Sequence, residues 1–158
     1  MDEQLKKCLN AAQRALAMRP LSTRDLKRKL TQKKFDPATI NATIEKLTTL
    51  KFLSDEKFAH AKALSSATHK LHGRRRAAAE LSRAGIASDI ASKALDQVYD
   101  KADTLAAARA LAEKQAPRLK KLDPQTARRR LLGMLQRRGF DYDEVRAVID
   151  AVLGPDSD

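Results

Sequence analysis

Residues 128–152, RRRLLGMLQRRGFDYDEVRAVIDAV, contain a spacing of apolar side chains that occurs three times in the chain. In this copy the six positions are Leu131, Leu135, Phe140, Val145, Ile149 and Val152. The same spacing lies 54 residues earlier, at Ala77, Leu81, Ile86, Ala91, Leu95 and Val98. It lies another 51 residues earlier at Leu26, Leu30, Phe35, Ile40, Ile44 and Leu47. A period near fifty residues predicts a tandem array in which each unit buries its apolar face against its neighbours.

Helix signals divide each copy into three segments. Ser22 is a suitable N-cap, and Asp36-Pro37 and Asp123-Pro124 each combine an N-cap with a proline at the first helical position. Ala and Leu dominate and β-branched runs are absent, which favours helices over strands. We therefore predict an all-α fold with helices at 4–18, 22–33, 37–51, 55–71, 74–84, 88–99, 102–116, 124–138 and 143–153. The fourth should bury Phe58, Ala61 and Leu64, and the seventh should end near Pro117.

These segments predict three tandem three-helix repeats that form an elongated, curved array. We place the repeats at residues 1–53, 54–100 and 101–153, followed by a disordered tail at 154–158. Gly85 and Gly139 each follow a second helix, where a residue that tolerates the left-handed conformation is favoured. Units of about fifty residues are marginal alone, so we expect stacking between units to contribute to stability.

Positive charge is concentrated on one helix of each repeat. The net charge of the chain is +12, and residues 19–34, 70–83 and 118–138 carry +6, +4 and +7. These windows hold +17 in total, so the remaining residues sum to −5. A basic excess of this size points to an anionic partner, most often nucleic acid.

The helical repeat also predicts which way these cations face. If Leu26, Ala77 and Leu131 point inward, residues two positions earlier lie on the outer face, at about 100° per residue. Arginine grips phosphates and carboxylates through paired hydrogen bonds. The side chains that we predict to form a basic binding surface are Arg24, Lys27, Arg28, Arg74, Arg75, Arg76, Arg83, Arg128, Arg129, Arg130, Arg137 and Arg138.

The chain offers little for catalysis or metal binding. His69 and His72 are one helical turn apart, but no cysteine or acidic cluster joins them, so we interpret both as surface residues. Asp55, Glu56 and His60 lie close together without a nucleophile, and capping roles explain them better. No glycine-rich phosphate loop is present. We predict no enzymatic activity, no metal and no cofactor.

Other features concern location and nucleic-acid chemistry. The single Cys8 excludes an internal disulfide, no apolar run approaches the roughly twenty residues of a membrane span, and the N-terminus lacks a hydrophobic signal core. We therefore predict a cytoplasmic protein that does not bind membranes, and we expect a monomer. Phe35 and Phe140 fall on core positions, which leaves few rings to stack on bases.

Four segments of the chain carry a resemblance to a known family. They are AQRALAMRPLSTRDLKRKL at 12–30 with KKF at 33–35, FLSDEKFAHA at 52–61, HGRRRAAAELSRAGI at 72–86, and RRGFDYDEVRAVI at 137–149. In order and spacing they resemble the RecX regulatory proteins, which modulate the RecA recombinase. The resemblance covers about residues 5–153. It implies a protein that binds RecA and its nucleoprotein filament and inhibits ATP hydrolysis, strand exchange and the co-protease activity behind the SOS response.

On this resemblance the basic surface would contact the filament, in its groove or at its growing end. Weak, sequence-nonspecific binding to single- or double-stranded DNA is compatible with the same charge. One alternative is a helix–turn–helix transcription regulator, but the third helices begin with acids such as Asp141, Asp143 and Glu144, which disfavours entry into a DNA groove. Another is an adaptor for acidic proteins, which fits the charge but not the resemblance.

Overall fold

The structure is a computed structural model that describes residues 2–156, with the backbone alone for Ala102. Over these residues the chain forms helices and no strand, so the all-α prediction is confirmed. The helices are α1 (Glu3–Met18), α2 (Thr23–Gln32), α3 (Pro37–Thr49), α4 (Asp55–Thr68), α5 (Arg74–Arg83), α6 (Ser88–Val98), α7 (Lys101–Leu119), α8 (Pro124–Arg137) and α9 (Tyr142–Leu153). The caps expected at Ser22, Asp36 and Asp123 each accept a backbone N–H two or three residues into the helix.

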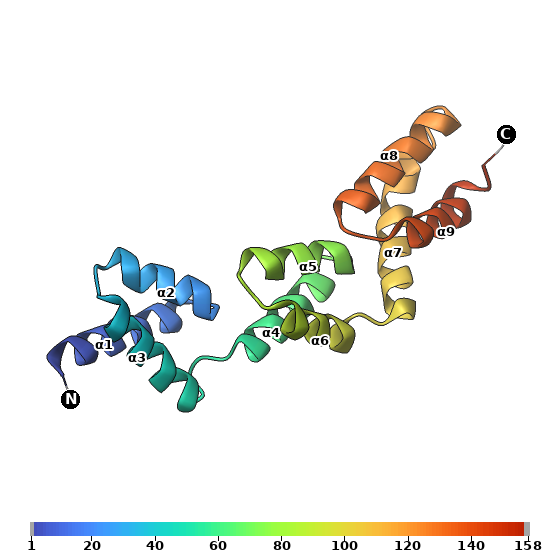
Figure 1. Cartoon of the computed structure of the whole chain (residues 1–158). Coiled ribbons are helices and arrows are strands. Elements are labelled where there is room, and N and C mark those ends of the chain that lie inside the picture. The colour runs from blue at the N-terminus through green and yellow to red at the C-terminus, as the bar shows by residue number, and fades with distance from the viewer. Residues whose placement is uncertain (1, 157–158) are drawn as a thin grey trace.

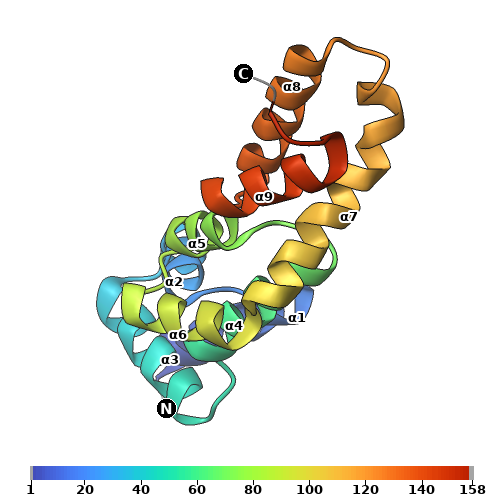
Figure 2. The same ribbon diagram turned by 90° about the vertical axis from the view of Figure 1, so that its right-hand side faces the viewer.

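The nine described helices form three successive units of three, which confirms the tandem arrangement. Figure 1 shows the units following one another from end to end, with α2, α5 and α8 along the same edge. Figure 2 shows α7–α9 rising away from the first two units, so the array is elongated and curved. Within the described range, no helix is both long and apolar enough to cross a membrane.

The repeated apolar spacing is the framework of each unit. All eighteen repeated positions are buried or partly buried, from Leu26 and Leu131, at 0% and 1% exposed, to the partly covered Phe35 and Val152. The prediction that each unit buries its apolar face against its neighbours was wrong. The buried side chains form three separate clusters, one per unit, and the substantial helix packing lies within units. Leu71, from the segment before α5, is the exception that packs against the third cluster.

Several details of the helices differ from the prediction. The helices predicted to end at residues 51 and 71 end earlier, at Thr49 and Thr68. In α4 the buried face consists of Ala59, Ala63 and Ser66, while Leu64 is 46% exposed and Ala61 is exposed as well. These small side chains let α4 approach α5 and α6 closely. The close packing of the helices stabilises the unit more than burial of the larger Leu64 side chain would. The seventh helix continues through Pro117 to Leu119 because a proline near the end of a helix disrupts few backbone hydrogen bonds.

The tail was expected to be disordered, yet residues 154–156 contact α8. The Arg128 guanidinium donates to the Gly154 carbonyl at 2.7 Å and lies 3.7 Å from Asp156. These contacts place the tail against the third unit. Residues 157–158 of the predicted tail, like residue 1 of the first predicted repeat, lie outside the described residues.

Candidate basic interface

The units are connected by polar contacts between the ends of their second helices. At the first joint, between units 1 and 2, the N-terminus of α2 meets the C-terminus of α5. The buried Ser22 hydroxyl donates to the Ala84 carbonyl at 2.6 Å, and the Arg24 guanidinium donates to the Arg83 carbonyl. The first joint therefore uses side chains from α2 and main-chain carbonyls from α5.

The second joint, between units 2 and 3, repeats this arrangement with α5 and α8. Its hydrogen bonds run from Gly73 N to Arg138 O at 2.6 Å, from Arg75 N to Gly139 O at 3.2 Å, and from Arg76 Nη1 to Arg137 O at 3.2 Å. In the repeat register, carbonyls 137 and 138 correspond to carbonyls 83 and 84. The same two acceptor positions thus serve both joints, although the second joint is made mainly by backbone groups.

The chemistry of helix ends explains this repeated contact. The first turn of a helix has N–H groups without partners in the helix, and the last turn has carbonyls without partners. The helix dipole places partial positive charge at the first end and partial negative charge at the other. The start of α2 lies against the end of α5, and the start of α5 lies against the end of α8. These contacts give partners to carbonyls of the last helical turns and bring dipole ends of opposite sign together. Asp55 of α4 completes the first joint by accepting the Thr23 N–H at 2.8 Å.

The close approach at the second joint depends on glycine. A Cβ on Gly73 would lie 2.4 Å from the Gly139 carbonyl oxygen, and a Cβ on Gly139 would lie 2.4 Å from the Arg76 nitrogen. Both contacts are with backbone atoms, which cannot rotate away as the end of a side chain can. The two backbones can meet only because neither residue has a side chain.

Seven of the twelve predicted cations have partners within the protein. Arg24, Arg76 and Arg138 donate to main-chain carbonyls of another unit or of the segment that precedes α5. Four others pair with carboxylates: Arg28 with Asp25 at 2.9 Å, Arg74 with Asp96 at 2.7 Å, Arg75 with Asp141 at 2.6 Å, and Arg128 with Asp150 at 2.6 Å. Arg128 is also only 16% exposed, so it is an internal contact of the third unit.

The side chains of the other five predicted cations are exposed and form no hydrogen bond or ion pair with the described residues. We call them the free cations: Lys27 of α2, Arg83 of α5, and Arg129, Arg130 and Arg137 of α8. Each unit supplies at least one of them from its second helix. Because the joints hold α2, α5 and α8 end to end along one edge, the free cations are distributed along the length of the array (Figure 1).

The His72 side chain belongs to a polar cluster in the middle unit. Its Nδ1 lies 3.0 Å from Glu80 Oε1, and Ser66 Oγ donates to Glu80 Oε2 at 2.6 Å. Burial lowers the pKa of His72, and the charge of Arg76 lowers it further. Burial alone would raise the pKa of Glu80, but the Ser66 hydrogen bond and the neighbouring positive charges bring it below its ordinary value.

The Tyr99 hydroxyl, which donates to the His72 carbonyl at 2.8 Å, completes this cluster. Burial, together with the charge of Glu80, raises the pKa of Tyr99 to about 12. The described residues contain no group of three His, Cys, Asp or Glu side chains that could hold a metal ion.

Some functional positions were not recognised from the sequence. Asp55 was interpreted as a helix cap and does act as one, but for a helix of the neighbouring unit. Gly73 precedes a run of arginines, and this position gave no signal that backbone would approach it. Arg146 of α9 is exposed and unpaired among the described residues. It was not predicted as part of the basic surface because it lies outside the basic segments 19–34, 70–83 and 118–138.

The fold and its surface define a class of protein: a tandem array of three-helix units with basic second helices. Comparisons with known proteins identify the family. Models of the first, second and third three-helix domains of RecX match residues 8–47, 54–95 and 102–149, respectively. The chain belongs to the RecX family of regulatory proteins.

Individual relatives agree with this assignment. Regulatory protein RecX of Chlorobaculum tepidum is 32% identical over 158 residues, covering 99% of this chain and 96% of its own. Regulatory protein RecX of Prosthecochloris aestuarii is 34% identical over 152 residues, covering 96% and 97%. The crystal structure of RecX from Lactobacillus salivarius superposes with a TM-score of 0.88 at 24% identity, covering 96% of this chain and 98% of that one. The first two of these relatives are named as regulatory proteins.

Proposed function

We propose that this chain is a cytoplasmic negative regulator of RecA that binds the RecA–DNA filament through its free cations. Binding would inhibit ATP hydrolysis, strand exchange and the co-protease activity that induces the SOS response. The observation that carries this proposal is the placement of the free cations on three helices that are joined end to end. Such an array presents positive charge at several points along one edge, which suits a long, repeating anionic partner.

The mechanism that we propose is a restriction of movement. An elongated array that contacts neighbouring RecA subunits, or the DNA phosphates beside them, would hold them in one arrangement. Subunits held in this way could not complete the changes that accompany ATP hydrolysis, and the bound array would obstruct access of duplex DNA or repressor. Three short, separate cores linked by polar joints would let the array follow the curvature of a filament.

The transcription-regulator alternative fits the structure less well. In the third unit, the start of α9 would have to enter a DNA groove if this helix recognised bases. Instead Asp141, the N-cap of α9, pairs with Arg75 of α5 across the second joint at 2.6 Å. The start of α9 is therefore engaged by the neighbouring unit and carries acids that would repel phosphates.

Charge reversal of one free cation per unit tests the proposal. In the test variant Lys27, Arg83 and Arg130 are replaced by Glu. None of these three side chains has a partner among the described residues, so helix content should be unchanged. In a matched control, Glu replaces Arg14, Lys93 and Lys114, which are exposed on α1, α6 and α7. Both triple variants lower the net charge from +12 to +6.

Co-sedimentation with RecA filaments assembled on single-stranded DNA would measure binding. We expect affinity to fall by at least about tenfold in the test variant, because like charges would now face the filament, and to change much less in the control. Equal binding by the two variants would show that net charge, and not the placement of the free cations, governs association. That result would remove the basis of the proposal.

A further inference from the structure

A second basic feature lies between α8 and α9, apart from the second joint. There the two helices border a hollow of ≈ 350 Å³. Its lining includes Arg129 from α8, and Tyr142 and Arg146 from α9. Leu132 and Ile149 supply apolar surface in the same hollow. An aromatic ring, apolar surface and the guanidinium groups of Arg128, Arg129 and Arg146 thus border one space large enough for a planar ring.

Two acids lie beside this hollow, and the single charge of Arg128 offsets one of them, so that Arg129 and Arg146 leave the surroundings with a net charge of +1. Asp150 and Asp156 both lie against Arg128, at 2.6 Å and 3.7 Å. Arg129 and Arg146 are exposed and have no hydrogen bond or ion pair with any described residue. The positive charge available to a ligand therefore comes from these two arginines.

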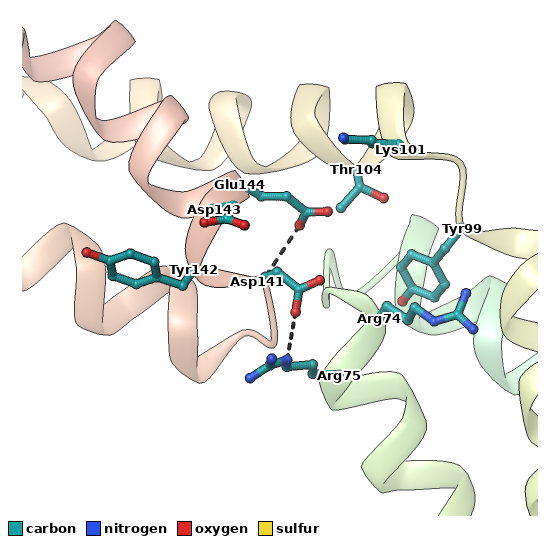
Figure 3. A pocket seen from close by; sticks show the side chains of 9 residues that line it. All are labelled: Arg74, Arg75, Tyr99, Lys101, Thr104, Asp141, Tyr142, Asp143 and Glu144. Carbon is teal, nitrogen blue, oxygen red and sulfur yellow. Dashed lines mark hydrogen bonds and ion pairs between the residues drawn. The ribbon is translucent and has the colours of Figure 1, made fainter.

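The hollow at the second joint provides a contrast. Figure 3 shows this space, of ≈ 550 Å³, which is lined by three cations, Arg74, Arg75 and Lys101, and by three acids, Asp141, Asp143 and Glu144. Its charges balance, and the Arg75 guanidinium is bound to Asp141. A polyanion gains little from such a surface. The hollow between α8 and α9 is thus the one of these two that favours an anion.

Tyr142 is the aromatic side chain placed to act there. It is 54% exposed, and Figure 3 shows its ring directed away from Tyr99 and Lys101 of the joint hollow. The other tyrosine, Tyr99, is half-buried and its hydroxyl is bonded to the His72 carbonyl. The only tyrosine free to stack on a ligand is therefore the one flanked by unpaired arginines.

We propose that the hollow between α8 and α9 binds a nucleotide unit of a single-stranded nucleic acid, with its base stacked on Tyr142 and its phosphates held by Arg129 and Arg146. Proteins that bind single strands combine aromatic stacking with basic side chains along the backbone, and stacking requires bases that are not paired within a duplex. Arginine adds planar, paired hydrogen bonds to phosphate. The site shares Arg129 with the free cations of the proposed function. None of Lys27, Arg83 and Arg130 lines the hollow, so the two proposals can be tested separately.

Tyrosine fluorescence tests stacking directly, because the chain contains no tryptophan and only two tyrosines. In a Tyr99→Phe variant, checked for unchanged helix content by circular dichroism, all tyrosine emission comes from Tyr142. Titration with a short thymidylate oligonucleotide should quench this emission. An abasic oligonucleotide of the same length, which has the phosphates but no bases, should bind more weakly and leave the emission unchanged. Equal affinity for the two oligonucleotides would overturn the proposal.

Substitutions then separate the ring from the charges. Tyr142→Leu should weaken binding of the thymidylate oligonucleotide roughly tenfold, while Tyr142→Phe, which keeps the ring, should bind like the wild type. Arg129→Gln combined with Arg146→Gln should reduce the salt dependence of log affinity by about 1.4, since each phosphate contact on a single strand contributes about 0.7. Arg14→Gln with Lys93→Gln is the matched control and should leave the slope unchanged. Wild-type affinity in Tyr142→Leu would refute the stacking role.

The filament proposal can be judged separately in the same assay. The Lys27→Glu, Arg83→Glu, Arg130→Glu variant should still show quenching of Tyr142 by the oligonucleotide, although we expect it to lose filament binding. Loss of quenching in that variant would contradict a separate site, because all three substitutions lie outside the hollow.

Discussion

The three second helices end in the same backbone conformation but in different surroundings. Lys34, Gly85 and Gly139 follow α2, α5 and α8 with φ angles of 68°, 78° and 90°. Only the ends of α5 and α8 receive the start of a preceding helix, and only these two ends have glycine. A left-handed turn alone therefore does not require glycine, since Lys34 adopts one. Glycine is required where a neighbouring unit approaches the turn.

The two joints also differ in how strictly they require it. A Cβ on Gly85 would meet the Arg24 side chain, with Cδ and Nε at 2.6 Å and Cβ at 2.9 Å. The outer atoms of Arg24 can move, and only its Cβ would require a small shift of the backbone. A Cβ on Gly139 would meet the Arg76 backbone nitrogen at 2.4 Å. The first joint therefore tolerates adjustment, whereas the second joint is fixed by main-chain atoms.

Gly139→Ala should have the largest effect. The new methyl group combines a left-handed strain of about 1–2 kcal/mol with a backbone clash, for which overpacking costs of about 1–3 kcal/mol are typical. We expect the second joint to open and the free energy of unfolding to fall by about 3 kcal/mol. Urea unfolding, with spin labels on α5 and α8 to follow their separation, would measure both effects.

Gly85→Ala is the matched control for that variant. It carries the same left-handed strain but meets a flexible side chain, so we expect a loss of only about 1–2 kcal/mol and an intact first joint. If the two variants were equally destabilised, the distinction between the joints would be wrong.

Ser22→Ala should have the next largest effect, because one hydroxyl performs two tasks. It accepts the Asp25 N–H as the cap of α2 and donates to the Ala84 carbonyl across the first joint. Losing a cap costs about 1 kcal/mol, and leaving a buried acceptor unpaired costs about 1–3 kcal/mol. We expect a total loss of about 2 kcal/mol in urea unfolding.

Ser54→Ala separates the two tasks. Ser54 caps α4 by accepting the Lys57 N–H and makes no hydrogen bond across a joint among the described residues, so its loss should cost only about 1 kcal/mol. An equally small loss in Ser22→Ala would show that the bond to Ala84 contributes nothing.

Lys34→Gly should have a small effect of opposite sign. Glycine relieves the left-handed strain but adds freedom to the unfolded chain, so we expect stabilisation of about 0.5 kcal/mol. Thermal unfolding would detect this as a small increase in Tm. A clear destabilisation would mean that the Lys34 side chain itself stabilises the folded chain.

The smallest effect that we expect is a dependence on pH that belongs to the middle unit. Both His72 and Glu80 have pKa values below their ordinary values of 6.5 and 4.5, so the folded chain binds fewer protons than the unfolded chain in this range. Stability should therefore be complete above about pH 6.5 and decline as the pH falls, first through His72 and then through Glu80.

Urea unfolding of the wild type and of Glu80→Gln between pH 7 and pH 4 would test this. The variant should be less stable at neutral pH. It should lose more stability than the wild type as the pH falls below about 6.5, because Glu80 no longer raises the pKa of His72, and it should lack the further decline through Glu80 itself. A parallel decline in the two proteins would show that these groups do not carry the pH dependence.

Much of this fold could be predicted from the sequence because its signals are local. The spacing of Leu131, Leu135 and Phe140 and its earlier copies placed the core, and Asp36-Pro37 and Asp123-Pro124 marked helix starts. The face of α4 was misjudged because Ala63 and Leu64 are adjacent, and the smaller side chain is buried for reasons of close packing.

The basic surface could be predicted only as a set of candidates. Arg76 and Arg130 look alike in the sequence, yet Arg76 holds a carbonyl of the next unit and Arg130 has no partner among the described residues. That difference arises where units separated by about fifty residues in sequence meet. Helical periodicity assigns a face to a side chain, but it does not show which neighbouring unit covers that face.

The most direct test of the account is RecA-catalysed, single-strand-dependent ATP hydrolysis, measured at fixed salt while this protein is titrated in. The wild-type chain and the Arg14→Glu, Lys93→Glu, Lys114→Glu control should inhibit hydrolysis, and the Lys27→Glu, Arg83→Glu, Arg130→Glu variant should not. Inhibition at substoichiometric amounts would indicate action at filament ends, and inhibition only near stoichiometric amounts would indicate coating of the groove. Hydrolysis that is unaffected by the wild-type chain, or inhibited equally by both triple variants, would contradict regulation through the free cations.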